Sequence, residues 1–135
     1  MADDKLFYVG QKAFINKSGS VPVLNDPNSK LDFPGGKIQI GENDFEESLR
    51  REVREETGLE IKIGDPFVTW YFEFKSGHRN AGKQVFLVGY RCEFVSGEVK
   101  LSNEHDSFQW VDKATYDDVD DRGGHFKALE KYFSK

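Results

Sequence analysis

Gly35-Gly36-Lys37-Ile38-Gln39-Ile40-Gly41-Glu42 is followed, after eight residues, by Arg51-Glu52-Val53-Arg54-Glu55-Glu56-Thr57-Gly58-Leu59. A glycine loop therefore precedes a segment whose apolar spacing predicts a helix from about Asp44 to Thr57. In that helix Glu52, Glu55 and Glu56 stand at i, i+3 and i+4, so all three carboxylates project from one face. Like charges at this spacing repel one another unless a multivalent cation neutralises them. Carboxylate oxygens at this density suit Mg²⁺ or Mn²⁺.

The apolar residues of this segment repeat every four positions, at Phe45, Leu49 and Val53. On a helical wheel Glu56 falls between Leu49 and Val53, so one carboxylate lies on the side that faces the core. The alternative interpretation is a solvated face on which the glutamates only pair with neighbouring arginines. The position of Glu56 favours the metal site.

Some ion pairs between these glutamates and the neighbouring arginines are nevertheless expected. Arg51 stands four residues from both Glu47 and Glu55. We expect Arg51 to brace Glu55 from behind while Glu55 faces the metal, as residues around a metal site orient its ligands.

The two quoted stretches resemble the Nudix box, G-x5-E-x7-R-E-U-x-E-E-x-G-U, in which U is a bulky aliphatic residue. Gly36-x5-Glu42 fits the first part and the residues from Arg51 to Leu59 fit the second, but eight residues rather than seven separate Glu42 from Arg51. We place the inserted residue in Asn43-Asp44-Phe45, where a loop absorbs it at little cost. The helix keeps its register, and Glu42 is the residue that the insertion can displace.

The resemblance implies a hydrolase that cleaves the pyrophosphate linkage of a nucleoside diphosphate joined to a moiety X by attack of water on phosphorus. It implies Mg²⁺ or Mn²⁺ held by Glu52, Glu55 and Glu56, with a backbone carbonyl at Gly35 or Gly36 as a further ligand. Catalytic roles fall to Arg51, Glu55 and Glu104, and substrate binding to Gly35, Gly36, Lys37 and Glu42.

Glu104 enters because the family usually adds an acidic residue outside the box, as a ligand or general base, in the loop before the last core strand. Here the loop over residues 102–107 precedes Phe108-Gln109-Trp110-Val111. Glu104 is our choice, and Asp106 and His105 are the alternatives.

The remaining pattern predicts strands separated by the helix. Strands are expected at Tyr8 to Ile15, Val21 to Leu24, Leu59 to Ile63, Val68 to Phe74, Gln84 to Phe94 and Phe108 to Asp112, with a turn or short helix to Val119 and a final helix from Gly124 to Phe133. The fourth and fifth strands read as a hairpin around a Gly77–Gly82 turn. This order resembles the Nudix α/β/α sandwich, an α+β fold with a mixed β-sheet.

Length and composition predict a single domain over residues 1–135, since 135 residues with 37% hydrophobic content bury a core without disulfides. A net charge of −5 argues against an extended nucleic-acid partner. No run suits a membrane span, and Met1 to Lys5 is too polar for a signal peptide, so we expect a cytoplasmic location. The expected partner is a small nucleotide, bound by a monomer or homodimer.

The cysteine, two of the histidines and a basic segment are interpreted as structural or surface residues rather than as parts of the site. Cys92 lies in an alternating strand and reads as a buried small hydrophobe. His78 and His125 have no partner at metal-ligand spacing and read as surface residues. The basic segment of residues 75–83 reads as a solvated hairpin loop, with contact to a phosphate as the alternative.

Other Nudix-fold functions make different demands on the sequence. A non-catalytic binding module should lack one or more helix glutamates, which this chain retains. An isoprenoid diphosphate isomerase needs a catalytic cysteine, and Cys92 stands mid-strand without such a role.

The sequence leaves the substrate open. No clear tag marks a subfamily, which leaves nucleoside triphosphates, including oxidised ones, as the default and ADP-ribose or another nucleotide sugar as the alternative. A base can stack on aromatic side chains, but core packing is the first interpretation of Trp70, Tyr71, Phe72 and Phe86.

Overall fold

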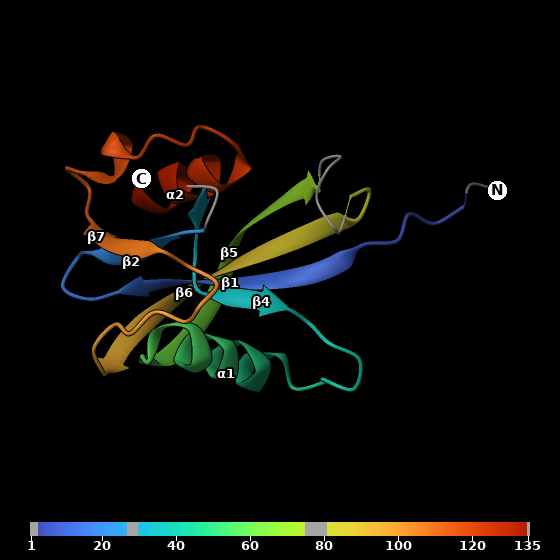
Figure 1. Cartoon of the computed structure of the whole chain (residues 1–135), viewed down its shortest axis with the longest axis horizontal. Coiled ribbons are helices and arrows are strands. Elements are labelled where there is room, and N and C mark those ends of the chain that lie inside the picture. The colour runs from blue at the N-terminus through green and yellow to red at the C-terminus, as the bar shows by residue number, and fades with distance from the viewer. Residues whose placement is uncertain (1–2, 27–29, 75–80, 135) are drawn as a thin grey trace.

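A computed structural model gives the fold and describes residues 3–26, 30–74 and 81–134. In these residues two sheets and two α-helices form layers around the longest strands (Figure 1). The elements are β1 (Tyr8–Asn16), β2 (Val21–Asn25), β3 (Leu31–Asp32), β4 (Gly35–Lys37), α1 (Phe45–Thr57), β5 (Glu60–Glu73), β6 (Gln84–Ser96), β7 (Ser107–Val111), the 3-10 turn η1 (Tyr116–Asp118) and α2 (Gly124–Phe133).

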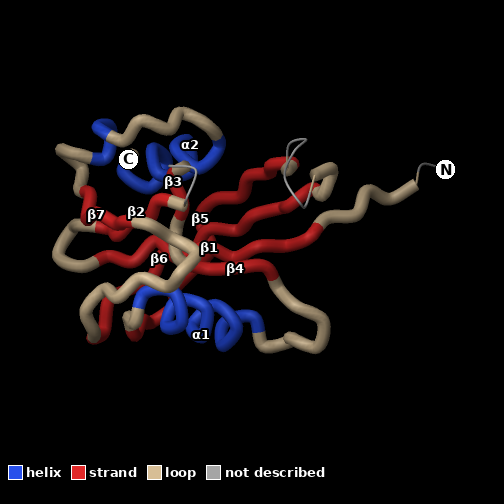
Figure 2. Tube along the Cα trace, viewed as in Figure 1, coloured by secondary structure: helices blue, strands red, loops and turns tan. Residues whose placement is uncertain are grey.

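The larger sheet has the strand order β4-β1-β6-β5 and is mixed, as predicted. Strand β1 runs parallel to β6, while β4 pairs with β1 and β5 pairs with β6 in antiparallel fashion. A second, antiparallel sheet of order β3-β2-β7 lies beside it (Figure 2). The sequence predicted its β2 and β7 strands but not their separation into a sheet of their own.

Each face of the larger sheet is covered by one helix, with α1 below it and α2 above it in the view of Figure 2. Alternate residues of β1 serve the two sides: Ala13 and Ile15 pack with Leu49 and Val53 of α1, whereas Phe14 packs in the cluster on the α2 side. Because both faces are covered here, the apolar residues Ala13, Phe14 and Ile15 follow one another without polar residues between them. The α2 side of the core also contains Val21, Val23, Leu31, Phe33, Val111, Phe126, Ala128 and Leu129.

Helix α1 begins and ends where its sequence signals stand. Asp44 is the N-cap, and its side chain accepts a hydrogen bond of 3.1 Å from the backbone N–H of Glu47. Gly58 ends the helix in the left-handed conformation, with φ of 76°, and its N–H reaches the carbonyl of Arg54. The helix therefore starts one residue later than predicted and keeps the register that the carboxylate argument requires.

Strand β5 corrects one prediction. The sequence suggested two strands, broken around Gly64 and Pro66, but β5 runs without interruption for 14 residues. Around Gly64 and Pro66 the pairing of β5 with β6 is irregular. Its register shifts between Ile63 and Pro66 and again between Pro66 and Val68. Proline is tolerated because β5 is an edge strand with irregular pairing.

The expected hairpin between β5 and β6 is present, with Glu73 opposite Gln84, but most of its predicted Gly77–Gly82 turn lies outside the described residues. Cys92 is buried, as expected, and burial raises the pKa of its thiol to about 12. No helix in the described ranges is long and apolar enough to cross a membrane.

Candidate active site

The glycine pair of β4 lies between β1 and helix α1. Gly35 has a φ of 147°, and a Cβ there would stand 1.9 Å from the carbonyl oxygen of Gln11. A Cβ on Gly36 would stand 2.7 Å from Oε2 of Glu52. Because Gly35 and Gly36 have no side chains, the backbone of β4 lies close to both β1 and the carboxylates of α1.

Glu56 is the carboxylate that faces the core, as its helical position predicted. Its side chain is largely buried, with 7% of the residue exposed, and its Oε1 accepts a hydrogen bond of 3.0 Å from the N–H of Gly35. Burial raises the pKa of Glu56 to about 7, although the nearby ammonium of Lys12 and the Gly35 N–H act in the opposite direction. At neutral pH this carboxylate therefore exchanges readily between its protonated and ionised forms, and a bound cation would favour the ionised form.

Arg51 joins the carboxylates of the helix to the glycine loop. Its guanidinium donates to both oxygens of Glu55, at 3.1 and 3.3 Å, and lies 3.3 Å from Oε1 of Glu52. The predicted brace on Glu55 is therefore present. Glu47 is held instead by Arg50, at 2.7 Å. The expected Glu47–Arg51–Glu55 series is wrong in its first member because Arg51 turns toward the loop.

The third partner of Arg51 is Glu42, to which its Nη2 donates. The N–H of Gln39 also donates to Glu42, at 2.8 Å. This backbone hydrogen bond and Arg51 together lower the pKa of the Glu42 carboxyl. Glu42 is therefore in contact with the arginine of the helix, although eight residues separate them in the sequence.

Glu52 and Glu55 occupy the same helix at different depths. The Glu52 side chain is half-buried, and its pKa is raised by burial and by the charges of Glu55, Glu42 and Glu104, against the effect of Arg51. The Glu55 side chain is 58% exposed. The helix therefore presents one buried, one half-buried and one exposed carboxylate.

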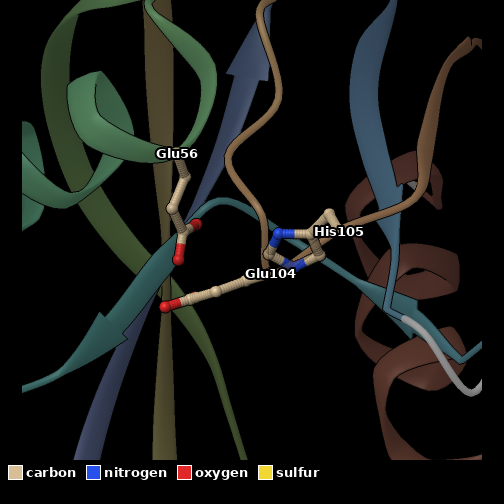
Figure 3. A group of neighbouring side chains, drawn as sticks. All are labelled: Glu56, Glu104 and His105. Carbon is tan, nitrogen blue, oxygen red and sulfur yellow. The ribbon is translucent and has the colours of Figure 1, made fainter.

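Glu104 approaches Glu56 from the loop between β6 and β7. Ligand atoms of Glu56, Glu104 and His105 all lie within 4.8 Å of one another (Figure 3). The structure thus brings our preferred residue outside the box, and one of its two alternatives, to the buried end of the helix carboxylates. Asp106 is exposed and stands outside this group, with its backbone N–H bonded to the carbonyl of Asn25.

Lys37, predicted to bind substrate, lies at the end of β4. Its ammonium stands 5.2 Å from the ring centre of Phe74 and 5.9 Å from that of Tyr8. The four predicted aromatic residues differ in exposure. Trp70 packs against Phe14 and Phe33, whereas Tyr71 and Phe86 are 44% and 36% exposed, so core packing was wrong for these two.

A model of the NUDIX domain matches residues 10–132 of this chain. The chain belongs to the Nudix family. The nucleoside triphosphatase NudI of Escherichia coli O139:H28 (strain E24377A / ETEC) is 30% identical over 118 residues, which cover 82% of this chain and 68% of that protein. These similarities identify a Nudix-type pyrophosphohydrolase.

Solved structures agree with this assignment. The MutT protein from Methanosarcina mazei Go1 is 27% identical and superimposes with a TM-score of 0.79, covering 98% of this chain and 96% of its own. An Ap4A hydrolase from C. elegans shares the Nudix fold, with 20% identity, a TM-score of 0.74 and coverage of 93% and 94%.

The donor set of this Nudix hydrolase fits a divalent cation. Carboxylate oxygens of Glu56 and Glu104 converge, and the main chain at Gly36 lies open to Glu52 because no side chain intervenes. The Nδ1 atom of His105 is buried and has no hydrogen-bond partner in the described part of the chain. A cation would add to the positive charge of Lys12 and favour the ionised form of the buried Glu56.

Sequence reasoning missed the polar network behind this site. Asp32 accepts hydrogen bonds from Lys12, at 2.9 Å, and pairs with Nε2 of His105 at 3.0 Å. Burial alone would raise the pKa of Asp32, but Lys12 and His105 hold it well below its usual range. Burial would likewise lower the pKa of Lys12 and of His105, yet Asp32 and Glu56 raise both. The sequence did contain a signal for this network: Lys12 in β1 and Asp32 in β3 are charged residues next to buried ones.

His125 belongs to the same region, so its interpretation as a surface residue is wrong. Its Nδ1 accepts a hydrogen bond of 3.2 Å from Nε1 of Trp70, and its ring stacks on Phe33. Helix α2 places it there, 3.5 Å from Asp32. His78 and most of the basic segment 75–83 lie outside the described residues.

Proposed function

We propose that this Nudix hydrolase acts on nucleoside triphosphates and releases the nucleoside monophosphate and pyrophosphate. The observation that carries the substrate class is the 30% identity to a nucleoside triphosphatase over 82% of the chain. The intact carboxylate set supports turnover rather than binding alone, because Glu52, Glu55 and Glu56 share the face of α1 beside Gly36.

Glu52, Glu55 and Glu56 hold Mg²⁺ or Mn²⁺, with the backbone carbonyl of Gly36 as an additional oxygen ligand. Bound divalent cations neutralise phosphate charge and lower the pKa of water. Glu56 contributes a fixed buried oxygen because Gly35 holds its other oxygen in place. Glu52 and Glu55 complete the set nearer to solvent.

Arg51 keeps three carboxylates in place, since it contacts Glu42, Glu52 and Glu55 together. Glu104 offers two oxygens, one toward the cation that Glu56 binds and one to accept the proton of the attacking water. Lys37 contributes a positive charge for the phosphates, and Gly36, which has no side chain, allows them to approach the backbone closely.

A substrate panel tests the proposal. Nucleoside triphosphates, including oxidised ones, are incubated with the protein and Mg²⁺ or Mn²⁺, and phosphate release is measured with and without added pyrophosphatase. We expect phosphate only after pyrophosphatase is added. Diadenosine tetraphosphate and ADP-ribose are included, with phosphatase as the coupling enzyme. A clear preference for either would refute the triphosphate assignment and leave the family activity intact.

Matched variants test the site. Glu56→Gln keeps the hydrogen-bond acceptor for Gly35 but loses the charge, and we expect less than about a tenth of wild-type turnover at saturating metal. Glu46→Gln removes the same charge from the exposed first turn of α1 and should retain activity. Equal activity of the two variants would show that Glu56 is not a principal ligand.

A further inference from the structure

The ring of His105 has one nitrogen with a partner and one without. Its Nε2 lies 3.0 Å from Oδ2 of Asp32. Its Nδ1 is buried and makes no hydrogen bond within the described residues, and only 7% of the residue is exposed. A buried nitrogen without a partner is costly and calls for an explanation.

Asp32 selects the tautomer of this ring. The salt bridge of 2.9 Å to Lys12 keeps Asp32 ionised, so its Oδ2 accepts a proton from Nε2. In the neutral imidazole the lone pair then stands on Nδ1. A carboxylate that holds the far nitrogen of a histidine is a common support for metal ligands because it fixes the ring and increases its basicity.

Nδ1 is also the nitrogen that is available to the carboxylates. His105, Glu56 and Glu104 each offer a ligand atom within 4.8 Å of the others, and Asp32 already occupies Nε2. In Figure 3 one nitrogen of the ring is directed toward the carboxylate of Glu56, and the side chain of Glu104 extends toward the same carboxylate. Ligands about 2.1 Å from one Mg²⁺ ion stand about 3 Å apart in cis and about 4.2 Å apart in trans, so small rotations close this group around an ion.

We propose that Nδ1 of His105 is a ligand of the cation held by Glu56 and Glu104, with Asp32 and Lys12 as its support. This inference rests on the metal site of the proposed function and adds a nitrogen to its oxygen ligands. Imidazole favours transition metals, whereas Mg²⁺ prefers oxygen. His105 therefore biases the site toward Mn²⁺ or Co²⁺ over Mg²⁺. The competing arrangement is an imidazolium that serves only as a counter-ion to the two glutamates.

Pulsed electron paramagnetic resonance of the Mn²⁺-loaded wild-type protein tests the ligand directly. We expect modulation from a coupled ¹⁴N nucleus, replaced by a ¹⁵N pattern when the protein is grown with ¹⁵N-histidine. His105→Gln should remove the coupling. His125→Gln should keep it, because His125 also lies near Asp32 but stands outside the group of three ligand atoms.

Titration calorimetry with Mn²⁺ alone and with Mg²⁺ alone gives a second measurement. His105→Gln should weaken Mn²⁺ binding by about 10- to 100-fold and change Mg²⁺ binding by less than about threefold. Equal losses for both ions would overturn the proposal, since a counter-ion or a purely structural residue affects the two ions alike.

The results also separate this inference from the proposed function. A wild-type protein that binds Mn²⁺ and hydrolyses nucleotide without nitrogen coupling refutes the ligand role of His105 alone. A wild-type protein that binds no Mn²⁺ refutes both proposals.

Discussion

Oε1 of Glu56 accepts a hydrogen bond of 3.0 Å from the backbone N–H of Gly35, which joins helix α1 to strand β4. The glycine pair at the start of the loop thus meets the carboxylates of the helix at this contact. Because this hydrogen bond fixes a largely buried carboxylate, Glu56 is held beside Glu104 and His105, whose ligand atoms lie within 4.8 Å of its own. A single hydrogen bond thus orients the most constrained acid of the site.

The first prediction concerns the pH dependence of stability without metal. Glu56 has an ordinary pKa of 4.5 and a pKa of about 7 in the fold, so the folded state binds its proton more tightly than the unfolded state. Its contribution is neutral below pH 4.5, becomes increasingly destabilising as pH rises from 4.5 to about 7, and is constant above that. The full penalty is about 3 kcal/mol at 1.36 kcal/mol per pKa unit.

Glu56→Gln should remove this penalty. In the presence of a chelator, urea unfolding at about pH 4 should give similar stabilities for both proteins, and at about pH 8 the variant should be more stable by up to about 3 kcal/mol. Mg²⁺ or Mn²⁺ should stabilise the wild type more than the variant. A stability difference independent of pH would contradict the assignment.

The second prediction concerns Arg51. Arg51→Ala should weaken metal binding by about 10- to 100-fold, because Glu42, Glu52 and Glu55 lose their common partner. The melting temperature should change little, since exposed ion pairs contribute little. Arg50→Ala is the control, as Arg50 bonds Glu47 on the same helix. A large fall in stability with unchanged metal affinity would indicate a purely structural role.

The third prediction is that alanine at Gly36 impairs metal binding, whereas alanine at Gly35 impairs stability. In Gly36→Ala the three atoms nearest to the new Cβ all belong to the flexible Glu52 side chain, so Glu52 should move and metal affinity should fall while the fold survives. In Gly35→Ala the Cβ meets the backbone of Gln11 at a φ of 147°, so the fold itself should lose more than about 2 kcal/mol. Calorimetric metal titration and thermal unfolding of both variants check this contrast; equal effects on stability would contradict it.

Local patterns were sufficient to predict helix α1 and the depth of Glu56. A helical period fixes the angle of each residue relative to Leu49 and Val53, and the cap residues Asp44 and Gly58 fix the ends. Arg51 contacts Glu42 although eight residues separate the two in the sequence. These features depend on neighbours in the sequence.

The network around Asp32 was not predictable in this way. Its partners Lys12 and His105 lie on β1 and on the loop before β7, and their meeting depends on how two separate sheets pack. The continuity of β5 across Pro66 likewise depends on its pairing with β6. Periodicity contains no information on either arrangement, because both are set by contacts between distant segments.

The last prediction concerns Glu104, which lies beside Glu56 but comes from a loop. As a general base it should contribute about 10²- to 10⁴-fold, so Glu104→Gln should lower kcat within that range at saturating metal and leave KM for the nucleotide nearly unchanged. The acidic limb of the wild-type pH–rate profile should flatten in the variant. Asp106→Asn, in the same loop and outside the ligand group, is the control and should behave as wild type. If Asp106→Asn lost activity and Glu104→Gln retained it, the base would lie two residues along this loop.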